Sequence, residues 1–304
     1  MTLGYTDQLL ILACDHRGSF QKKLLGIEGT PTPDEEARIR DAKFLIFTGF
    51  RQALSEGGVD GMGILIDEQF GSEPAREARE LGVVLAMPVE KSGQNEFDFE
   101  YGEEFGEHIE AFGPSFSKVL VRYNPEGDAE MNRRQAERLA RLSRWLHDND
   151  RRFLFELLVP AEPDQLERAG GDTDRYDREL RPDLMIAAIG ALQRAGVEPD
   201  VWKIEGLDSS DDCVRVAEAA RAGGRDEVSC VVLGRGGNED KVADWLRTGA
   251  GVPGYIGFAV GRTIWWDPLS DWLGGGDADA AAAAIAANYR RLIDVYTSSA
   301  TAAR

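Results

Sequence analysis

Eight short apolar runs, separated by charged and helix-favouring segments, constrain the fold of this 304-residue sequence more than any other feature. The runs are nearly continuous in apolar character instead of alternating, which is typical of parallel strands covered on both faces. They occupy residues 9–15, 59–67, 83–90, 118–124, 152–160, 200–206, 230–236 and 255–262. Segments with helical character lie between them, at residues 33–58, 129–150, 178–197, 210–224, 238–251 and 277–296.

This alternation predicts a single (β/α)8 barrel over residues 1–304, because no Pro/Ser-rich linker divides the chain. A doubly wound open sheet is the alternative, but no G-x-G-x-x-G sequence follows the first predicted strand. Two long polar and aromatic segments, 92–115 and 161–176, are expected to be loops over the active face of the barrel.

Composition and charge exclude several classes of protein. The net charge of −19 argues against binding to nucleic acid or to an anionic membrane, since both need a positive surface. The three cysteines, Cys14, Cys213 and Cys230, lack metal-ligand spacing and indicate a reducing compartment. The first residues lack the basic region of a signal peptide, and no apolar run reaches the roughly 18 residues that span a bilayer. We therefore expect a cytoplasmic protein.

Ionisable residues stand at nearly every predicted strand end. In a barrel these ends converge on the active site, so a ring of charged side chains there indicates catalysis or ligand binding. Some members of the ring are expected to be ion pairs that close the barrel top. They are Asp15, Asp67, Glu90 with Lys91, Arg122, Glu156, Lys203 with Glu205, Arg235 and Arg262.

Lys203 lies in the middle of the apolar run "DVWKIEG", where a charged side chain is unfavourable. A lysine in such surroundings, near other cations, is expected to give up its proton and become a nucleophilic amine. That amine attacks a ketone to form a Schiff base, which lets a C–C bond break without a metal. The alternative is that Lys203 only forms an ion pair with Glu205 or Glu156.

Two carboxylates are the further catalytic candidates. Glu156 interrupts "FLFELLV", where burial is unfavourable unless the carboxylate is paired or protonated, and it serves either as a proton shuttle or as the partner of Lys203. Asp15 ends "LACD" and either binds substrate hydroxyls or caps the next turn. His16 is close enough in sequence to contact the site, but three scattered histidines form no zinc motif, so no metal cofactor is expected.

The last two predicted strands both end in Gly-Arg, in "VVLGRGG" and "GFAVGRT". Barrels commonly bind phosphate in the loops after strands seven and eight, where glycine allows close approach and arginine donates bidentate hydrogen bonds. The sequence therefore predicts a phosphate site. Its residues are Gly234, Arg235, Gly236, Gly261 and Arg262, although Arg235 and Arg262 could instead pair with acids of this acidic protein.

Five stretches, "ACDHRGSF", "FLFELLVP", "VWKIEG", "CVVLGRG" and "GFAVGRTIWWDPL", occur in this order. With them the chain, from about Leu9 to Leu269, resembles the aldolase domain fused to the sugar kinase in many bacterial myo-inositol catabolism proteins. That domain is assigned as 5-dehydro-2-deoxyphosphogluconate aldolase and is related to class I tagatose-bisphosphate and DhnA-type fructose-bisphosphate aldolases.

The resemblance implies a barrel with Lys203 as the Schiff-base lysine, Glu156 and Asp15 as catalytic carboxylates, and phosphate at the Gly-Arg loops, with no cofactor. The related fructose-bisphosphate enzymes carry a tyrosine acid near strand five. No tyrosine occurs in "RRFLFELLVPAEP", so proton donation is assigned to Glu156.

The implied substrate is 2-deoxy-5-keto-D-gluconate 6-phosphate, cleaved to dihydroxyacetone phosphate and malonate semialdehyde. Its carboxylate end needs a further cation, for which Arg17, Lys91 and Arg122 are candidates. Tagatose or fructose bisphosphate and sulfofructose phosphate remain alternative substrates. A barrel isomerase or epimerase using Asp67 and Glu156, and a non-catalytic sugar-phosphate-binding module, remain alternative functions. Since barrel aldolases commonly associate, we expect a homo-oligomer.

Overall fold

The computed structural model describes residues 2–57 and 59–302, and its strands close into a parallel barrel in sequence order, β1 to β8. This confirms the predicted (β/α)8 barrel, and each predicted apolar run overlaps one strand. The strands are β1 (Leu9–Ala13), β2 (Met62–Leu65), β3 (Val84–Pro88), β4 (Phe116–Arg122), β5 (Arg152–Leu158), β6 (Val201–Glu205), β7 (Ser229–Leu233) and β8 (Tyr255–Val260).

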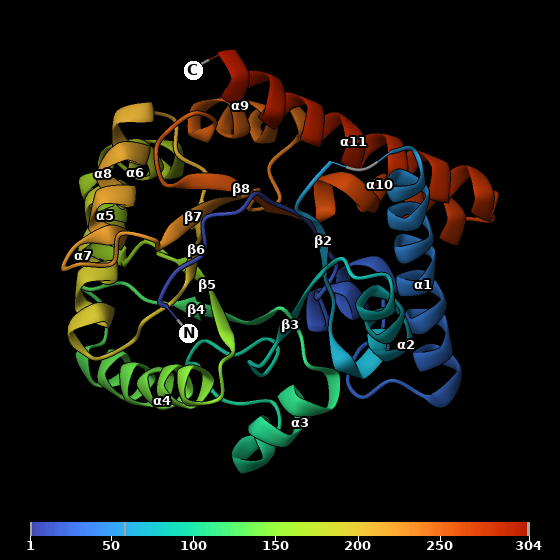
Figure 1. Ribbon diagram of the computed structural model, residues 1–304, viewed down its shortest axis with the longest axis horizontal. Coiled ribbons are helices and arrows are strands. Elements are labelled where there is room, and N and C mark those ends of the chain that lie inside the picture. The colour runs from blue at the N-terminus through green and yellow to red at the C-terminus, as the bar shows by residue number, and fades with distance from the viewer. Residues whose placement is uncertain (1, 58, 303–304) are drawn as a thin grey trace.

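The helices surround the strands on the outside of the barrel (Figure 1). They are α1 (Pro33–Ser55), α2 (Glu68–Glu80), α3 (Phe105–Phe112), α4 (Ala129–Asp148), α5 (Pro163–Arg168), α6 (Thr173–Glu179), α7 (Arg181–Arg194), α8 (Ser210–Arg221), α9 (Glu239–Gly249), α10 (Arg262–Leu273) and α11 (Ala278–Ala302). Two short irregular turns, the π-helix η1 (Phe20–Leu24) and the 3-10 helix η2 (Gly102–Glu104), complete the chain.

The two segments expected to be loops contain helices. Segment 92–115 includes η2 and α3, while segment 161–176 includes α5 and the first part of α6. Helices α2 and α10 have no counterpart among the predicted segments. Helix α1 begins at Pro33, as predicted, where Thr32 and Glu35 form a capping box. The predicted end of this helix, Gly58, lies outside the described residues.

Side chains that point into the barrel form layers. Most of the barrel interior is apolar, and its members come from alternate positions of the strands, as the two-residue period of a strand requires. They are Leu9, Ile11, Ala13, Leu65, Ala86, Phe116, Leu154, Val201, Val231 and Ala259. Two residues further along β4, β5 and β6 the same inward face carries Lys118, Glu156 and Lys203. The barrel interior therefore changes from apolar to charged within one layer.

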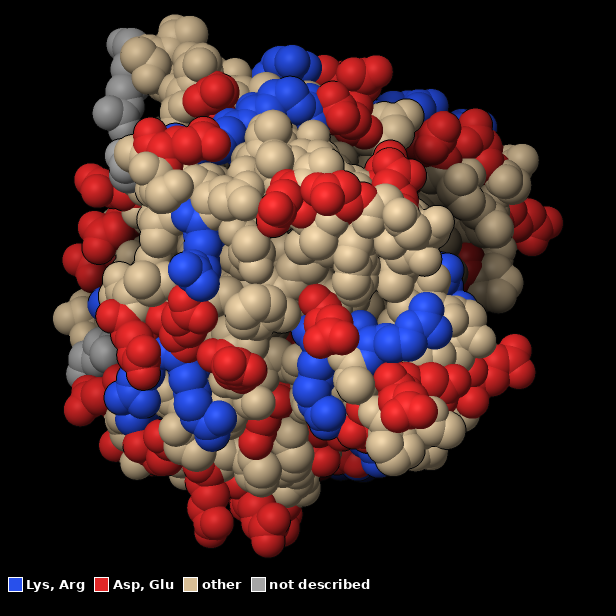
Figure 2. Space-filling view, turned by 90° about the vertical axis from the view of Figure 1, so that its right-hand side faces the viewer, with Lys and Arg blue, Asp and Glu red and all other residues tan. Residues whose placement is uncertain are grey.

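The outer surface carries charges of both signs. On the face seen in Figure 2, acidic and basic side chains are intermixed and neither sign forms one continuous patch. No helix among the described residues is both long and apolar enough to cross a membrane.

Candidate active site

A cavity of about 600 Å³ opens at the carboxyl ends of the strands. Its lining includes each residue predicted for the Schiff-base mechanism, for the phosphate site and for the carboxylate end of the substrate. A buried charged floor and a glycine-rich wall from the β7 and β8 loops organise it, and several further cations line it: Arg17, Lys22, Lys23, Lys91 and Arg122.

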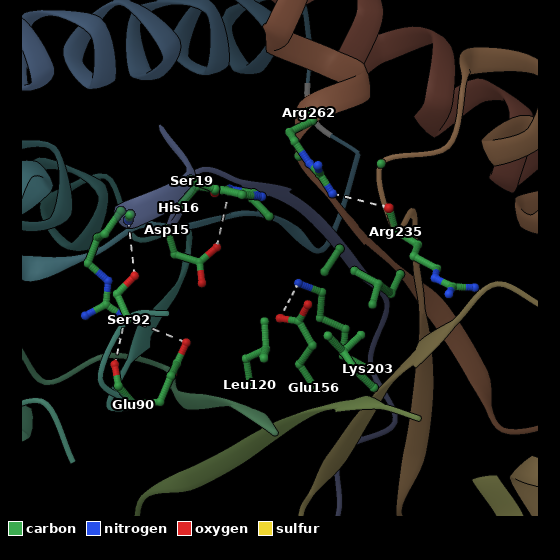
Figure 3. A pocket seen from close by; sticks show the side chains of 18 of the residues that line it. Asp15, His16, Ser19, Glu90, Ser92, Leu120, Glu156, Lys203, Arg235 and Arg262 are labelled. Atoms are coloured by element: carbon green, nitrogen blue, oxygen red, sulfur yellow. Dashed lines mark hydrogen bonds and ion pairs between the residues drawn. The ribbon is translucent and has the colours of Figure 1, made fainter. Parts of the chain in front are cut away.

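Lys203 and Glu156 face each other on the cavity floor (Figure 3). They occupy paired positions of the neighbouring strands β6 and β5. Lys203 Nζ donates a hydrogen bond of 2.9 Å to Glu156 Oε2, and both side chains are almost completely buried. The ion pair that the sequence left open therefore exists, and it places an amine next to a proton acceptor.

A second buried lysine, Lys118, lies at the centre of the charged floor, and the sequence analysis did not identify it. Its Nζ donates to Asp15 Oδ2 and to Glu90 Oε1, both at 2.7 Å, and lies 3.1 Å from Glu156 Oε2. Lys118 thus binds three carboxylates, two of them just beyond the ends of β1 and β3 and one on β5, whereas the ion-pair partner of Lys203 among the described residues is Glu156.

These contacts determine the protonation of the floor. Burial disfavours the charge of Lys118, but Asp15, Glu156 and Glu90 outweigh this and hold its pKa above the ordinary lysine range. Burial likewise opposes the charge of Asp15, yet Lys118 and Lys203 hold its pKa well below the usual range. The pKa of Glu156 is also lowered, because the same two ammonium groups outweigh burial. Lys118 therefore stays a cation at neutral pH.

Glu90 differs from the other two carboxylates on Lys118. Burial raises its pKa, and Lys118 and Arg17 only partly offset this effect. Its Oε1 accepts from Lys118, while its Oε2 is buried without a hydrogen-bond partner among the described residues. Glu90 is therefore the least fully paired of the three carboxylates around Lys118.

His16 lies beside Asp15 on the cavity lining. Its ring packs edge-on against Trp265, and its Nδ1 lies 4.0 Å from Asp15 Oδ1. Burial lowers the pKa of His16 to about 4, despite the opposing effect of Asp15. The ring is therefore neutral at neutral pH and can exchange hydrogen bonds with a ligand without adding charge.

The β7 and β8 loops form the predicted glycine-rich wall. Gly236 has a φ of +74°, and a Cβ there would lie 2.3 Å from Nη2 of Arg262, so the arginine packs directly on the glycine. Arg262 begins α10, and its Nη2 donates to the backbone carbonyl of Arg235 at 3.2 Å. Among the described residues Arg262 has no carboxylate partner, which leaves its charge available to an anion.

Arg235 does pair with acids, as the alternative interpretation of the sequence stated. Its Nε lies 2.9 Å from Glu205 Oε1 and its Nη1 lies 2.5 Å from Asp177 Oδ2. Glu205, two residues after Lys203 on β6, also accepts a hydrogen bond of 2.9 Å from Val159 N. The backbone of Arg235 borders the cavity, but its charge is neutralised.

The candidates for a second anion site fall into two groups. Arg17 is already engaged, because its Nη1 donates to Glu100 Oε2 at 2.9 Å and its Nη2 to the Glu90 carbonyl at 2.7 Å. The guanidinium of Arg122 donates to the Gln94 carbonyl at 2.8 Å, and within the described part of the chain neither Arg122 nor Lys91 has a carboxylate partner. Two further cations on the lining, Lys22 and Lys23 of η1, were not predicted.

Asp67 does not belong to the cavity lining, which removes the carboxylate pair Asp67 and Glu156 as a catalytic unit. Its Oδ1 accepts from Phe70 N at the start of α2, and its Oδ2 pairs with Lys43. Both members of that ion pair are fully buried behind β1 and β2. In the part of the chain that the structure describes, no cluster of three or more His, Cys, Asp or Glu side chains has an arrangement suited to a metal ion.

One family model matches residues 3–300, and its description is "Uncharacterized protein conserved in bacteria (DUF2090)". The chain belongs to the DUF2090 family. No curated protein sequence matches the chain.

Solved structures with the same fold cover most of this DUF2090 chain. Fructose-bisphosphate aldolase from Plasmodium falciparum is 14% identical with a TM-score of 0.64, over 94% of this chain and 89% of that one. Cgl0159 from Corynebacterium glutamicum is 19% identical with a TM-score of 0.59, over 93% and 86%. Fructose-bisphosphate aldolase from Slackia heliotrinireducens is 15% identical with a TM-score of 0.55, over 92% and 86%. At these identities the likeness establishes the barrel fold of the DUF2090 chain.

Proposed function

We propose that this protein is a class I aldolase that cleaves a phosphorylated ketose through a Schiff base on Lys203. The most specific form of the proposal is cleavage of 2-deoxy-5-keto-D-gluconate 6-phosphate to dihydroxyacetone phosphate and malonate semialdehyde, a step of myo-inositol catabolism. The same fold in two fructose-bisphosphate aldolases supports an aldolase.

The contrast between the two buried lysines is the observation that carries the proposal. Lys118 binds three carboxylates and remains an ammonium group, so it supplies fixed positive charge. Lys203, on the cavity floor, has Glu156 as its ion-pair partner among the described residues and can transfer a proton to that carboxylate. One lysine is thereby suited to electrostatic stabilisation and the other to nucleophilic attack.

Formation of the Schiff base begins with proton transfer from Lys203 to Glu156 across their 2.9 Å hydrogen bond. The neutral amine adds to the C5 ketone, and a second amine proton passes to the bound oxygen. Glu156 then returns its proton to the resulting hydroxyl, which leaves as water. The product is an iminium ion on Lys203, with Glu156 again a carboxylate.

Cleavage requires a base for the C3 hydroxyl, and Glu156 accepts that proton while Asp15 orients the hydroxyl. Electrons of the C3–C4 bond move to the iminium as malonate semialdehyde leaves, which gives an enamine. Glu156 then protonates C4 of the enamine, and water hydrolyses the imine to release dihydroxyacetone phosphate. The water lost on imine formation is thus regained, and Lys118 holds both carboxylates in place throughout.

The direct test is incubation with dihydroxyacetone phosphate followed by borohydride and mass spectrometry. We expect a stable adduct on the peptide that contains Lys203, and cleavage activity that survives EDTA. If no adduct forms with any ketose phosphate over a range of pH, the Schiff-base mechanism is wrong. A binding module or an isomerase would also give no adduct.

Gly236→Ala is expected to raise KM for a phosphorylated ketose about tenfold, the effect of displacing one charged hydrogen bond. The new Cβ would meet the Arg262 guanidinium at 2.3 Å, and the φ of +74° disfavours alanine. Steady-state kinetics provide the measurement. Gly29→Ala is the control, because it has a similar φ of +77° but open space around it. An equal effect of both changes would contradict the role of Gly236.

Arg122→Gln tests the far end of the substrate. We expect KM to rise about tenfold for a ketose phosphate that ends in a carboxylate or sulfonate, because a charge-assisted contact is lost. A ketose phosphate with a neutral end should be affected little. Steady-state kinetics on such a matched pair, each cleaved by the wild type, provide the measurement. Equal losses on both substrates would assign the arginine to general cavity structure.

A further inference from the structure

Arg235 borders the cavity with its backbone but directs its guanidinium away from Lys203 and Glu156 (Figure 3). The guanidinium lies between Asp177 of α6, at 2.5 Å, and Glu205 of β6, at 2.9 Å. An arginine in a phosphate-binding loop could either rotate to contact the ligand, or keep its ion pairs and hold the loop in position. The surrounding contacts favour the second role.

A second arginine, Arg181, lies within ion-pair distance of the same two acids as Arg235, although its Nε and Nη1 make no hydrogen bond among the described residues. Arg181 Nε lies 3.1 Å from Asp177 Oδ1, and its Nη1 lies 3.6 Å from Glu205 Oε2. Two arginines therefore balance two carboxylates. Glu205 is only 3% exposed, so withdrawal of Arg235 would leave a buried carboxylate with incomplete pairing, which is unfavourable.

The backbone of Arg235 contacts Arg262, the arginine whose charge is available to an anion. Its carbonyl accepts a hydrogen bond of 3.2 Å from Arg262 Nη2. Its φ is +47°, a conformation that a residue with a Cβ adopts only when its surroundings hold it there. The side-chain pairs with Asp177 and Glu205 supply such a restraint.

We propose that Arg235 is a positioning residue: its ion pair with Asp177 holds the β7 loop so that the Arg235 carbonyl aims Arg262 at a phosphate group. The pair stays intact when phosphate binds, and Arg262 and the glycine backbone contact the anion. This rests on the proposed function for the use of the phosphate site and adds a residue, Asp177 of α6, that controls it.

Calorimetric titration with inorganic phosphate tests the proposal, because the two roles of Arg235 predict opposite signs. We expect Asp177→Asn to weaken phosphate binding about tenfold, as the loop and Arg262 lose their restraint. If Arg235 instead swings onto phosphate, the same change frees it and strengthens binding. Glu179→Gln is the matched control: it removes one negative charge from the same helix, but Glu179 pairs with Arg175.

Two further measurements exclude a general structural effect. In an Arg235→Gln background, Asp177→Asn should cause no additional loss of phosphate affinity, and thermal unfolding should show that each variant is folded. Imine formation with dihydroxyacetone, which lacks phosphate, should proceed at the wild-type rate in Asp177→Asn. Stronger phosphate binding, an effect equal to that of Glu179→Gln, or slowed imine formation would each overturn the proposal.

The test is independent of catalysis. Phosphate titration needs no Schiff base, so absence of a borohydride adduct in the wild type would contradict the proposed function and leave this inference standing. Absence of phosphate binding by the wild type at millimolar concentration would overturn the inference. It would not affect the Schiff-base mechanism, which the borohydride-trapped adduct on Lys203 tests separately.

Discussion

Replacement of Lys203 by methionine is expected to abolish the borohydride-trapped adduct and to lower kcat/KM for ketose phosphate cleavage by at least about 10⁴-fold. A loss of this size is typical when the nucleophile of a covalent mechanism is removed. The fold should survive, because Glu156 still lies 3.1 Å from Lys118 and so keeps a cationic partner. Mass spectrometry after borohydride treatment and steady-state kinetics provide the measurements.

Lys203→Arg is the matched control for charge. The arginine preserves a cation beside Glu156 but forms no imine with the substrate, so it should be as inactive as Lys203→Met. If Lys203→Arg retains a trapped adduct, another lysine forms the Schiff base, and Lys118 would be the first to examine. If it retains cleavage without an adduct, the lysine acts by charge alone and the covalent mechanism is wrong.

Most of the barrel could be predicted from the sequence because buried parallel strands are nearly continuous apolar runs. Lys118 was missed for a specific reason. The predicted fourth strand began at Lys118, which would place that residue at the bottom of the barrel, whereas β4 begins at Phe116. With the observed start, the two-residue period sets Lys118 on the inward face one position pair above Phe116, from which its Nζ reaches Glu156 Oε2 at 3.1 Å. A two-residue error at a strand boundary therefore concealed the centre of the charged floor.

The roles of the arginines could not be predicted from the sequence. Arg235 and Arg262 occur in the same Gly-Arg context, yet one is neutralised by two acids and the other has none within the described residues. The difference comes from Asp177 and Glu205, which lie 58 and 30 positions earlier in the chain. Similarly, Asp67 ends a strand as Asp15 does, but Lys43 of α1 binds it behind the sheet. Such pairings depend on tertiary contacts that local sequence does not encode.

Replacement of Lys118 by methionine is expected to lower the free energy of unfolding by about 3–5 kcal/mol at neutral pH, the effect of breaking a buried ion-pair cluster. Methionine has a similar length, so little volume is lost. However, Asp15 and Glu90 lose their shared ammonium partner at 2.7 Å while remaining buried. Chemical denaturation at pH 7 measures the loss. Lys91→Met removes a lysine from the exposed rim of the same cavity and should change stability by less than about 0.5 kcal/mol.

The pH dependence of this loss separates charge from packing. In the wild type the pKa of Asp15 is lowered by folding, so its contribution to stability is present above its ordinary value of about 4 and is lost as the pH falls further. The raised pKa of Lys118 keeps its own contribution constant below the ordinary lysine pKa of about 10. In Lys118→Met the buried carboxylates lose their main stabilising charge, so their pKa values rise and protonation favours the folded state. The stability difference between wild type and variant should therefore shrink as the pH is lowered from 7 towards about 5. A difference that stays constant over this range would show that Lys118 contributes by packing, and would contradict its assignment as the fixed cation of the active site.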